Sequence, residues 1–199
     1  MSTDTPASAP SETILLPESA GPILLALARA AIAAKLGTIC AVDEGHEWLC
    51  NRRASFITLM HANKLRGCIG TLEAHRALGE DVKANAVAAA FSDPRFQPLT
   101  PPEFETVSVE VSVLSRLQTL PFRDENDALE QLRPEIDGVI FEYGHHRSTF
   151  LPQMWDDFRD PRLFLSHLKY KAGLPPDFWD PTVKLSRYTV NKWRETGTA

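Results

Sequence analysis

Hydrophobic residues recur at two spacings along the chain, and the two spacings predict helices and strands in turn. Apolar residues three or four positions apart form one face of an α-helix. This spacing occurs at residues 21–36, 78–91 and 161–172. Pro22 suits a first helical turn, and Gly37 suits the end of the same helix. In the third helix we expect one buried face made of Leu163, Phe164, His167 and Leu168.

Shorter stretches are rich in β-branched and aromatic residues, which predicts strands. They are residues 54–60, 65–71, 107–113, 138–143, 148–151 and 184–190. The turn residues at 61–64 and 144–147 join two pairs of these strands into hairpins. A short helix is expected at 124–132, and the three prolines of 97–104 predict a loop.

The order of these elements indicates the fold class. Hairpins mixed with helices, without regular β-α-β alternation, favour an α+β fold with a largely antiparallel sheet. Residues 1–19 are rich in Ser, Thr, Pro and Ala, so we expect a disordered tail there. Residues 20–195 are expected to form one domain, and residues 196–199 a frayed end.

Composition narrows the class of protein. The 199 residues are 43% hydrophobic with a formal charge of -5, which is typical of a soluble globular chain and disfavours nucleic acid as a partner. The three cysteines are scattered, which fits neither a disulfide framework nor zinc-ligand spacing. The most apolar stretch, 23–36, is too short to span a bilayer, and no basic segment typical of an export signal precedes it. These features predict a cytoplasmic protein without a membrane segment.

The least ordinary stretch is 65–71, because a thiol and a guanidinium stand between two glycines inside an expected strand. If the strand is regular, Arg66 and Cys68 project to the same face while Gly67 leaves the other face bare. Glycine weakens a strand unless a backbone or a ligand must come close or a bulge is required. The stretch therefore predicts a site, with Gly70 and Thr71 as further binding residues.

Cys68 has two interpretations. A cation such as Arg66 lowers the pKa of a nearby thiol and can orient a substrate, and backbone amides around the glycines could bind an oxyanion. A general base would have to come from one of four histidines, His61, His75, His145 or His146. The alternative is a small buried cysteine that packs in a tight hairpin, since free cysteine is among the most buried residue types.

Two other stretches carry candidate binding residues. His145 and Arg147 flank His146 in a polar turn that could bind an anion or a metal, although no chelating spacing is present and a solvated turn is the favoured interpretation. Arg95 lies in a stiff Asp-Pro-Arg-Phe loop, where it could clamp a carboxylate or a phosphate. The alternative is a helix stop in which Phe96 packs in the core and the arginine pairs locally.

Several blocks of the chain, in the same order, resemble the AMMECR-domain family, known in prokaryotes as protein A of the Amme/Memo/radical-SAM system. The similar blocks are residues 56–59, 65–70, 88–96, 98–100, 110–114, 150–153 and 171–175. The resemblance implies a compact α+β protein with a larger and a smaller lobe, and a cleft that the cysteine-containing hexapeptide faces. It implies no reaction.

Three functional hypotheses follow. The first is an enzyme, or enzyme subunit, that acts on a small anionic or carbonyl-bearing molecule through Cys68. The second is a non-catalytic interaction or regulatory module that partners a Memo-like or radical-SAM protein, and the third, nucleic-acid binding, is the least favoured. No cofactor and no metal are expected. The expected site residues are Cys68 as nucleophile, with Arg66, Gly67, Gly70, Thr71, Arg95, His145 and Arg147 in binding.

Overall fold

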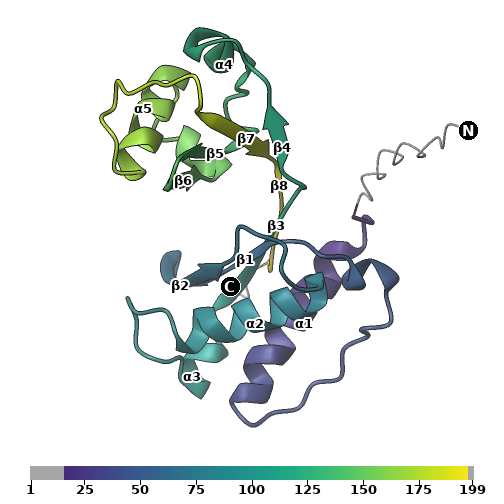
Figure 1. Cartoon of the computed structure of the whole chain (residues 1–199). Coiled ribbons are helices and arrows are strands. Elements are labelled where there is room, and N and C mark those ends of the chain that lie inside the picture. The colour runs from purple at the N-terminus through teal and green to yellow at the C-terminus, as the bar shows by residue number, and fades with distance from the viewer. Residues whose placement is uncertain (1–15, 197–199) are drawn as a thin grey trace, which may run out of the picture.

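The protein has two lobes, each built on a four-stranded antiparallel sheet (Figure 1). The computed structural model describes residues 16–196, so most of the expected tail and residues 197–199 of the expected frayed end lie outside the described residues. Helices and antiparallel strands are mixed as the sequence predicts, and the α+β class is confirmed. The strands divide between two sheets, where the sequence pattern indicated one.

The first lobe contains a sheet with the strand order β2-β1-β3-β8. The strands are β1 (Ser55–His61), β2 (Lys64–Gly70), β3 (Ser108–Leu114) and β8 (Val190–Arg194). Figure 1 shows the long helices α1 (Ala20–Lys35) and α2 (Leu78–Phe91) on the face of this sheet that points away from the second lobe. The apolar faces of both helices and of the sheet form one core, so the opposite face of the sheet is the one left toward the second lobe.

The second lobe contains a sheet with the order β4-β7-β5-β6. The strands are β4 (Gln118–Leu120), β5 (Gly138–Tyr143), β6 (His146–Phe150) and β7 (Lys184–Tyr188). The helices of this lobe are α4 (Glu125–Gln131) and α5 (Pro161–Lys171), and a 3-10 turn, η2 (Pro152–Trp155), follows β6. This lobe has its own core of buried aromatic and aliphatic side chains.

Several details differ from the sequence prediction. The expected strand 184–190 is two strands in different sheets, because the chain crosses from one lobe to the other at Thr189. The expected loop 97–104 contains a short helix, α3 (Pro101–Phe104), and a further 3-10 turn, η1 (Glu47–Cys50), precedes β1. Strand β3 is buried on both faces despite its alternating pattern. In α5, Leu163 and His167 are exposed, and Leu165 and Lys169 are buried in their place.

Two chain segments cross between the lobes, one directly after β3 and one between β7 and β8. They are hydrogen-bonded to each other: the amide of Ser115 donates to the carbonyl of Thr189 at 2.8 Å, and the amide of Thr189 donates to Ser115 Oγ at 2.9 Å. A small apolar cluster of Ala54, Leu114, Ile140 and Tyr188 lies beside this crossing. The lobes are therefore joined at one side. No helix within residues 16–196 is both long and apolar enough to cross a membrane.

Candidate functional site

The cysteine-containing hexapeptide, residues 65–70, lies on β2, an edge strand of the first sheet, and pairs with β1. Thr58 is opposite Cys68, and Phe56 is opposite Gly70. The register shifts next to Leu59, which leaves Arg66 as an extra residue in β2, a β-bulge. The strand is not regular at this point, so the condition under which Arg66 and Cys68 would project together is not met.

Gly67 faces α2. A Cβ atom at Gly67 would lie 2.2 Å from the carbonyl oxygen of Ala89, and this distance is too short for any side chain. The face of β2 that Gly67 leaves without a side chain is therefore covered by the alanine-rich helix α2. Gly70 is equally constrained on the other face, since its Cβ would lie 2.2 Å from the ring of Phe56.

Asp93 and Arg95 hold the backbone of Cys68 from the outer edge of the sheet. Asp93 Oδ2 accepts the Cys68 amide at 2.9 Å, and an Nη of Arg95 donates to the Cys68 carbonyl at 3.2 Å. Arg95 also donates to both oxygens of Asp93, at 2.9 and 2.7 Å. These hydrogen bonds from Arg95, with that from the Cys68 amide, hold the pKa of the buried Asp93 far below its usual range. The pair satisfies the backbone N–H and C=O of Cys68, which would otherwise be open at this strand edge.

The Cys68 sulfur is half-buried and accepts a hydrogen bond from Thr58 Oγ1 at 3.4 Å. Arg95, rather than Arg66, is the cation beside it, and the pKa of Arg95 is raised, chiefly by its hydrogen bonds to Asp93. Within residues 16–196, none of the four candidate histidines is hydrogen-bonded to the sulfur. The Cys68 amide is already taken by Asp93, so it is not the oxyanion donor that the sequence suggested.

Arg66 is bound within its own lobe. Its guanidinium donates to both oxygens of Glu103, at 2.9 and 3.2 Å, and to the carbonyl of Gln97 at 3.0 Å. The hydrogen bond from Arg66 is the largest cause that lowers the pKa of Glu103 to about 2, followed by hydrogen bonds from Thr100. Arg66 thus connects the bulge of β2 to α3.

Thr71 joins a buried network around Asp81, whose carboxylate is 1% exposed. Thr71 Oγ1 donates to Asp81 at 3.0 Å, and the amide and hydroxyl of Ser55 donate at 2.9 and 2.7 Å. Arg76 forms an ion pair with the same carboxylate at 2.9 Å. This network fixes the end of β2 against the start of β1 and α2, and Asp81 was not among the residues that the sequence singled out.

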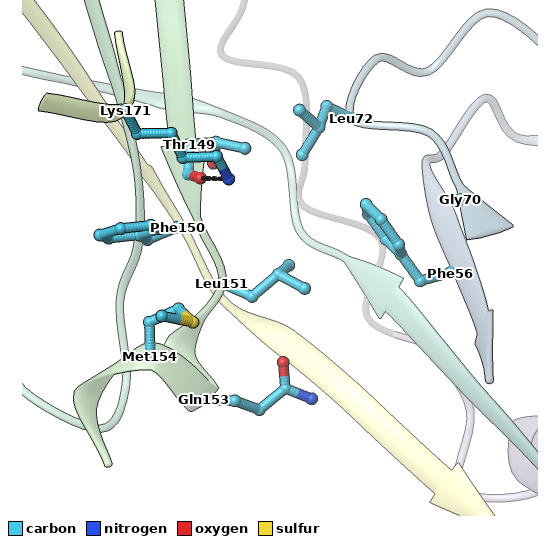
Figure 2. A pocket seen from close by; sticks show the side chains of 9 residues that line it. All are labelled: Phe56, Gly70, Leu72, Thr149, Phe150, Leu151, Gln153, Met154 and Lys171. Carbon is cyan, nitrogen blue, oxygen red and sulfur yellow. Dashed lines mark hydrogen bonds between the residues drawn. The ribbon is translucent and has the colours of Figure 1, made fainter. Parts of the chain in front are cut away.

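A cleft of about 570 Å³ opens between the lobes next to the hexapeptide. Figure 2 shows Phe56, Gly70 and Leu72 of the first lobe on one side of it. The other side belongs to the second lobe, with the side chains of Thr149, Phe150, Leu151, Gln153, Met154 and Lys171. Most of these side chains are apolar, and Lys171 supplies the one charge among them.

Cys68 lies on the same face of β2 as Gly70, because residues two apart on a strand share a face. Its Cα is about 7 Å along the strand from that of Gly70, at about 3.3 Å per residue. The register across the sheet places Thr58, Glu110 and Arg194 in one row with Cys68. The thiol is therefore on the cleft side of the sheet, one side-chain row beyond the residues that line the cleft.

The polar turn of the second lobe contributes to the contact between the lobes. Arg147 forms ion pairs with Glu73 at 2.7 Å and with Glu142 at 3.2 Å, and Glu73 belongs to the loop that follows the hexapeptide. His145 is exposed and its ring lies 4.3 Å from that of His146. Arg147 is thus near the hexapeptide loop, while His145 is at the surface. Within residues 16–196, no three His, Cys, Asp or Glu side chains come together as a metal site would require.

Sequence reasoning missed the cleft residues of the second lobe. Leu151 lies between β6 and η2, Met154 lies in η2, and Lys171 is the last residue of α5. In the sequence each of them looks like an ordinary packing or surface residue. The blocks 150–153 and 171–175, which contain Leu151 and Lys171, were singled out as part of the resemblance, without a role. Asp93 could have been recognised, because it belongs to the same loop as Arg95.

Comparison with known proteins identifies the family. The model of the AMMECR1 family matches residues 25–193, and the chain therefore belongs to that family. Protein MJ0810 of Methanocaldococcus jannaschii is 34% identical over 186 residues, which cover 91% of this chain and 92% of that protein. A protein of Methanothermobacter thermautotrophicus is 38% identical over 148 residues, 73% of this chain and 77% of its own. The crystal structure of uncharacterized protein PH0010 from Pyrococcus horikoshii aligns with a TM-score of 0.76 at 32% identity, over 89% of this chain and 92% of that one.

Proposed function

We propose that the protein binds, in the cleft between its lobes, a mainly apolar small molecule that carries an anionic group. The observation that carries this proposal is the cleft itself, about 570 Å³ in volume, with apolar walls and one lysine. Ligand sites are usually concave and apolar, of roughly 300–1,000 Å³, with a few polar groups that orient the ligand.

Lys171 is the group that orients the ligand. Its ammonium donates to the carbonyl of Thr149 at 2.9 Å and lies 5.1 Å from the centre of the Phe150 ring. These contacts hold the charge at the cleft and leave hydrogens of the ammonium for a further acceptor, since an ammonium has three. A carboxylate or sulfonate beside it would receive a charge-assisted hydrogen bond.

The test uses 8-anilinonaphthalene-1-sulfonate, an apolar aromatic anion, as a fluorescent probe on the full chain. We expect Lys171→Met to weaken its binding about tenfold, because a hydrogen bond to a charged group contributes roughly 1.5–3 kcal/mol. Lys35→Met, at the end of α1, is the matched control and should leave binding unchanged. The neutral analogue N-phenyl-1-naphthylamine should bind equally to the wild type and to Lys171→Met.

A second variant tests the apolar wall. Leu151→Asn should weaken both probes, because it places a polar side chain in the cleft. Unchanged binding of the sulfonate in both Lys171→Met and Leu151→Asn would contradict the proposal.

Chemistry at Cys68 is the second candidate function, and the observation that favours it is the position of the thiol on the cleft side of β2. A ligand in the cleft would reach toward it, and Arg95 supplies a cation nearby. In this version the protein is an enzyme or enzyme subunit, and the ligand is a small anionic or carbonyl-bearing substrate. Association with a Memo-like or radical-SAM protein stays a prediction, which co-purification of the full chain with either candidate would test.

A further inference from the structure

Gln153 is a polar residue of the cleft lining that the anion site does not use. It lies in η2, two residues after Leu151, and lines the cleft together with Lys171. Figure 2 shows its amide directed from the second lobe into the space between the lobes, on the same side as Leu151. The wall of the second lobe therefore presents a neutral amide to the cleft as well as an ammonium.

The Gln153 amide has no partner within the protein. Among residues 16–196, no group is hydrogen-bonded to its side-chain oxygen or nitrogen. The hydroxyl of Thr149, which also lines the cleft, differs in this respect, because it donates to the Val139 carbonyl at 2.9 Å. Gln153 is exposed, so its amide is hydrated until a ligand replaces the water.

A ligand that fills the cleft removes this hydration, and an amide that loses water without gaining a hydrogen bond opposes binding. The side chain of glutamine has both an acceptor oxygen and an NH₂ donor. A carboxylate offers acceptors alone and an ammonium offers donors alone, whereas a carboxamide or lactam offers an acceptor and a donor side by side. A neutral amide is therefore the group that best matches Gln153.

Gln153 and Lys171 lie toward opposite ends of the same wall, with Phe150 and Leu151 between them (Figure 2). The ammonium of Lys171 is held at Thr149, to whose carbonyl it donates at 2.9 Å. Gln153 follows Thr149 by four positions, so their Cα atoms are at most about 14 Å apart, at ~3.5 Å per residue. One small molecule with a short apolar middle spans this distance.

We propose that the cleft selects small molecules that combine an anionic group, an apolar middle and a neutral carboxamide or lactam, and that Gln153 binds the amide. The anion lies at Lys171, and the apolar middle lies between the walls of the two lobes. This inference rests on the proposed function, because it assigns the chemistry of the other end of the same ligand. Gln153 then determines specificity, and Lys171 anchors the anion.

The experiment compares two probes as competitors of 8-anilinonaphthalene-1-sulfonate on the full chain. The first is the monoamide of suberic acid, a polymethylene chain with a carboxylate at one end and a carboxamide at the other. The second is 8-methylnonanoate, in which an isopropyl group of similar size replaces the carboxamide. Gln153→Met removes the amide and keeps an unbranched side chain. We expect it to weaken the monoamide about tenfold, because two hydrogen bonds are lost, and to leave 8-methylnonanoate unchanged or slightly tighter.

Gln118→Met, at an exposed position on β4, is the matched control and should bind both probes as the wild type does. Thermal melting should show equal stability of Gln153→Met and the wild type, since the Gln153 amide has no partner in the protein to lose. Lys171→Met should weaken both probes, because both carry the carboxylate.

An equal ratio of the two affinities in the wild type and in Gln153→Met would overturn this inference. Failure of the monoamide to displace the sulfonate from the wild type would also overturn it. If Lys171→Met still weakened the binding of the sulfonate in either case, the anion site would stand and only the assignment of Gln153 would be wrong. Failure of Lys171→Met to weaken the sulfonate or either probe would instead contradict the proposed function, so the two failures are distinguishable.

Discussion

The carboxylate of Asp93 accepts the backbone amide hydrogen of Cys68 at 2.9 Å, so a residue 25 positions later in the chain determines where the thiol lies. Arg95 donates a second hydrogen bond to the same residue, to the Cys68 carbonyl at 3.2 Å. Arg95 pairs locally with Asp93, as the helix-stop interpretation of the Asp-Pro-Arg-Phe loop expects, although Phe96 is half-buried rather than packed in the core. Asp93 and Arg95 together clamp the edge of the protein's own sheet.

Replacement of Asp93 by asparagine should lower the free energy of unfolding by about 2–3 kcal/mol, because the charged hydrogen bonds to Arg95 and to the Cys68 amide are lost or weakened. Urea denaturation at neutral pH measures this change. Asp157→Asn, at an exposed position without such bonds, should change stability by less than about 0.5 kcal/mol. Equal stability of the two variants would mean that the clamp contributes nothing.

The same carboxylate predicts a pH dependence. The pKa of Asp93 is lower in the folded protein than in the unfolded chain, so its contribution to stability is complete above the ordinary pKa of about 4 and decreases as pH falls below it. Glu103, with a folded pKa of about 2, acts in the same direction. The wild type should therefore lose stability between about pH 5 and 2 more steeply than Asp93→Asn. Parallel curves for the two proteins would contradict the assignment.

Gly67→Ala should destabilise the protein by about 1–3 kcal/mol, because a Cβ 2.2 Å from the Ala89 carbonyl oxygen forces β2 away from α2. Gly79→Ala is the matched control. A Cβ at Gly79 would meet Leu49 at an ordinary 3.5 Å, and alanine has the higher helix propensity, so this variant should be neutral or stabilising by up to about 1 kcal/mol. Thermal melting of both variants distinguishes a close approach from a general intolerance of substitution.

The hairpin shows how far local pattern can predict this fold. Its strands follow from β-branched and aromatic content, and its turn from Asn63, which tolerates the positive φ of 60° that it adopts. Ala62 also has a positive φ, of 47°, which alanine rarely adopts and which the sequence did not indicate. A bulge was one explanation of the glycines in this strand, but its position at Arg66 could not be predicted, because Arg66 is held by Glu103 and Gln97, which are distant in sequence. The split of the last strand at Thr189 could not be predicted either. The residues on both sides of Thr189 have strand character, and nothing local indicates that they belong to different sheets.

The cleft needed the structure for a different physical reason. The hexapeptide was recognisable because a thiol, a guanidinium and two glycines form an uncommon local combination. The opposite wall uses residues such as Leu151 and Met154, which could fill any core, and only the relation between the lobes leaves them facing a cavity. Apolar pattern predicts burial, and it does not distinguish burial in a core from the lining of a cleft.

Alkylation tests whether a ligand in the cleft shields the Cys68 thiol. Cys68 is half-buried and accepts a hydrogen bond from Thr58, so iodoacetamide should modify it more slowly than it modifies the exposed Cys40 and Cys50. The naphthalene sulfonate should slow the modification of Cys68 further, because its proposed site in the cleft is one side-chain row away, and it should leave the rate at Cys40 unchanged. Peptide mass spectrometry over time gives each rate. Equal protection of all three cysteines would indicate that the probe acts on the reagent or on the whole protein.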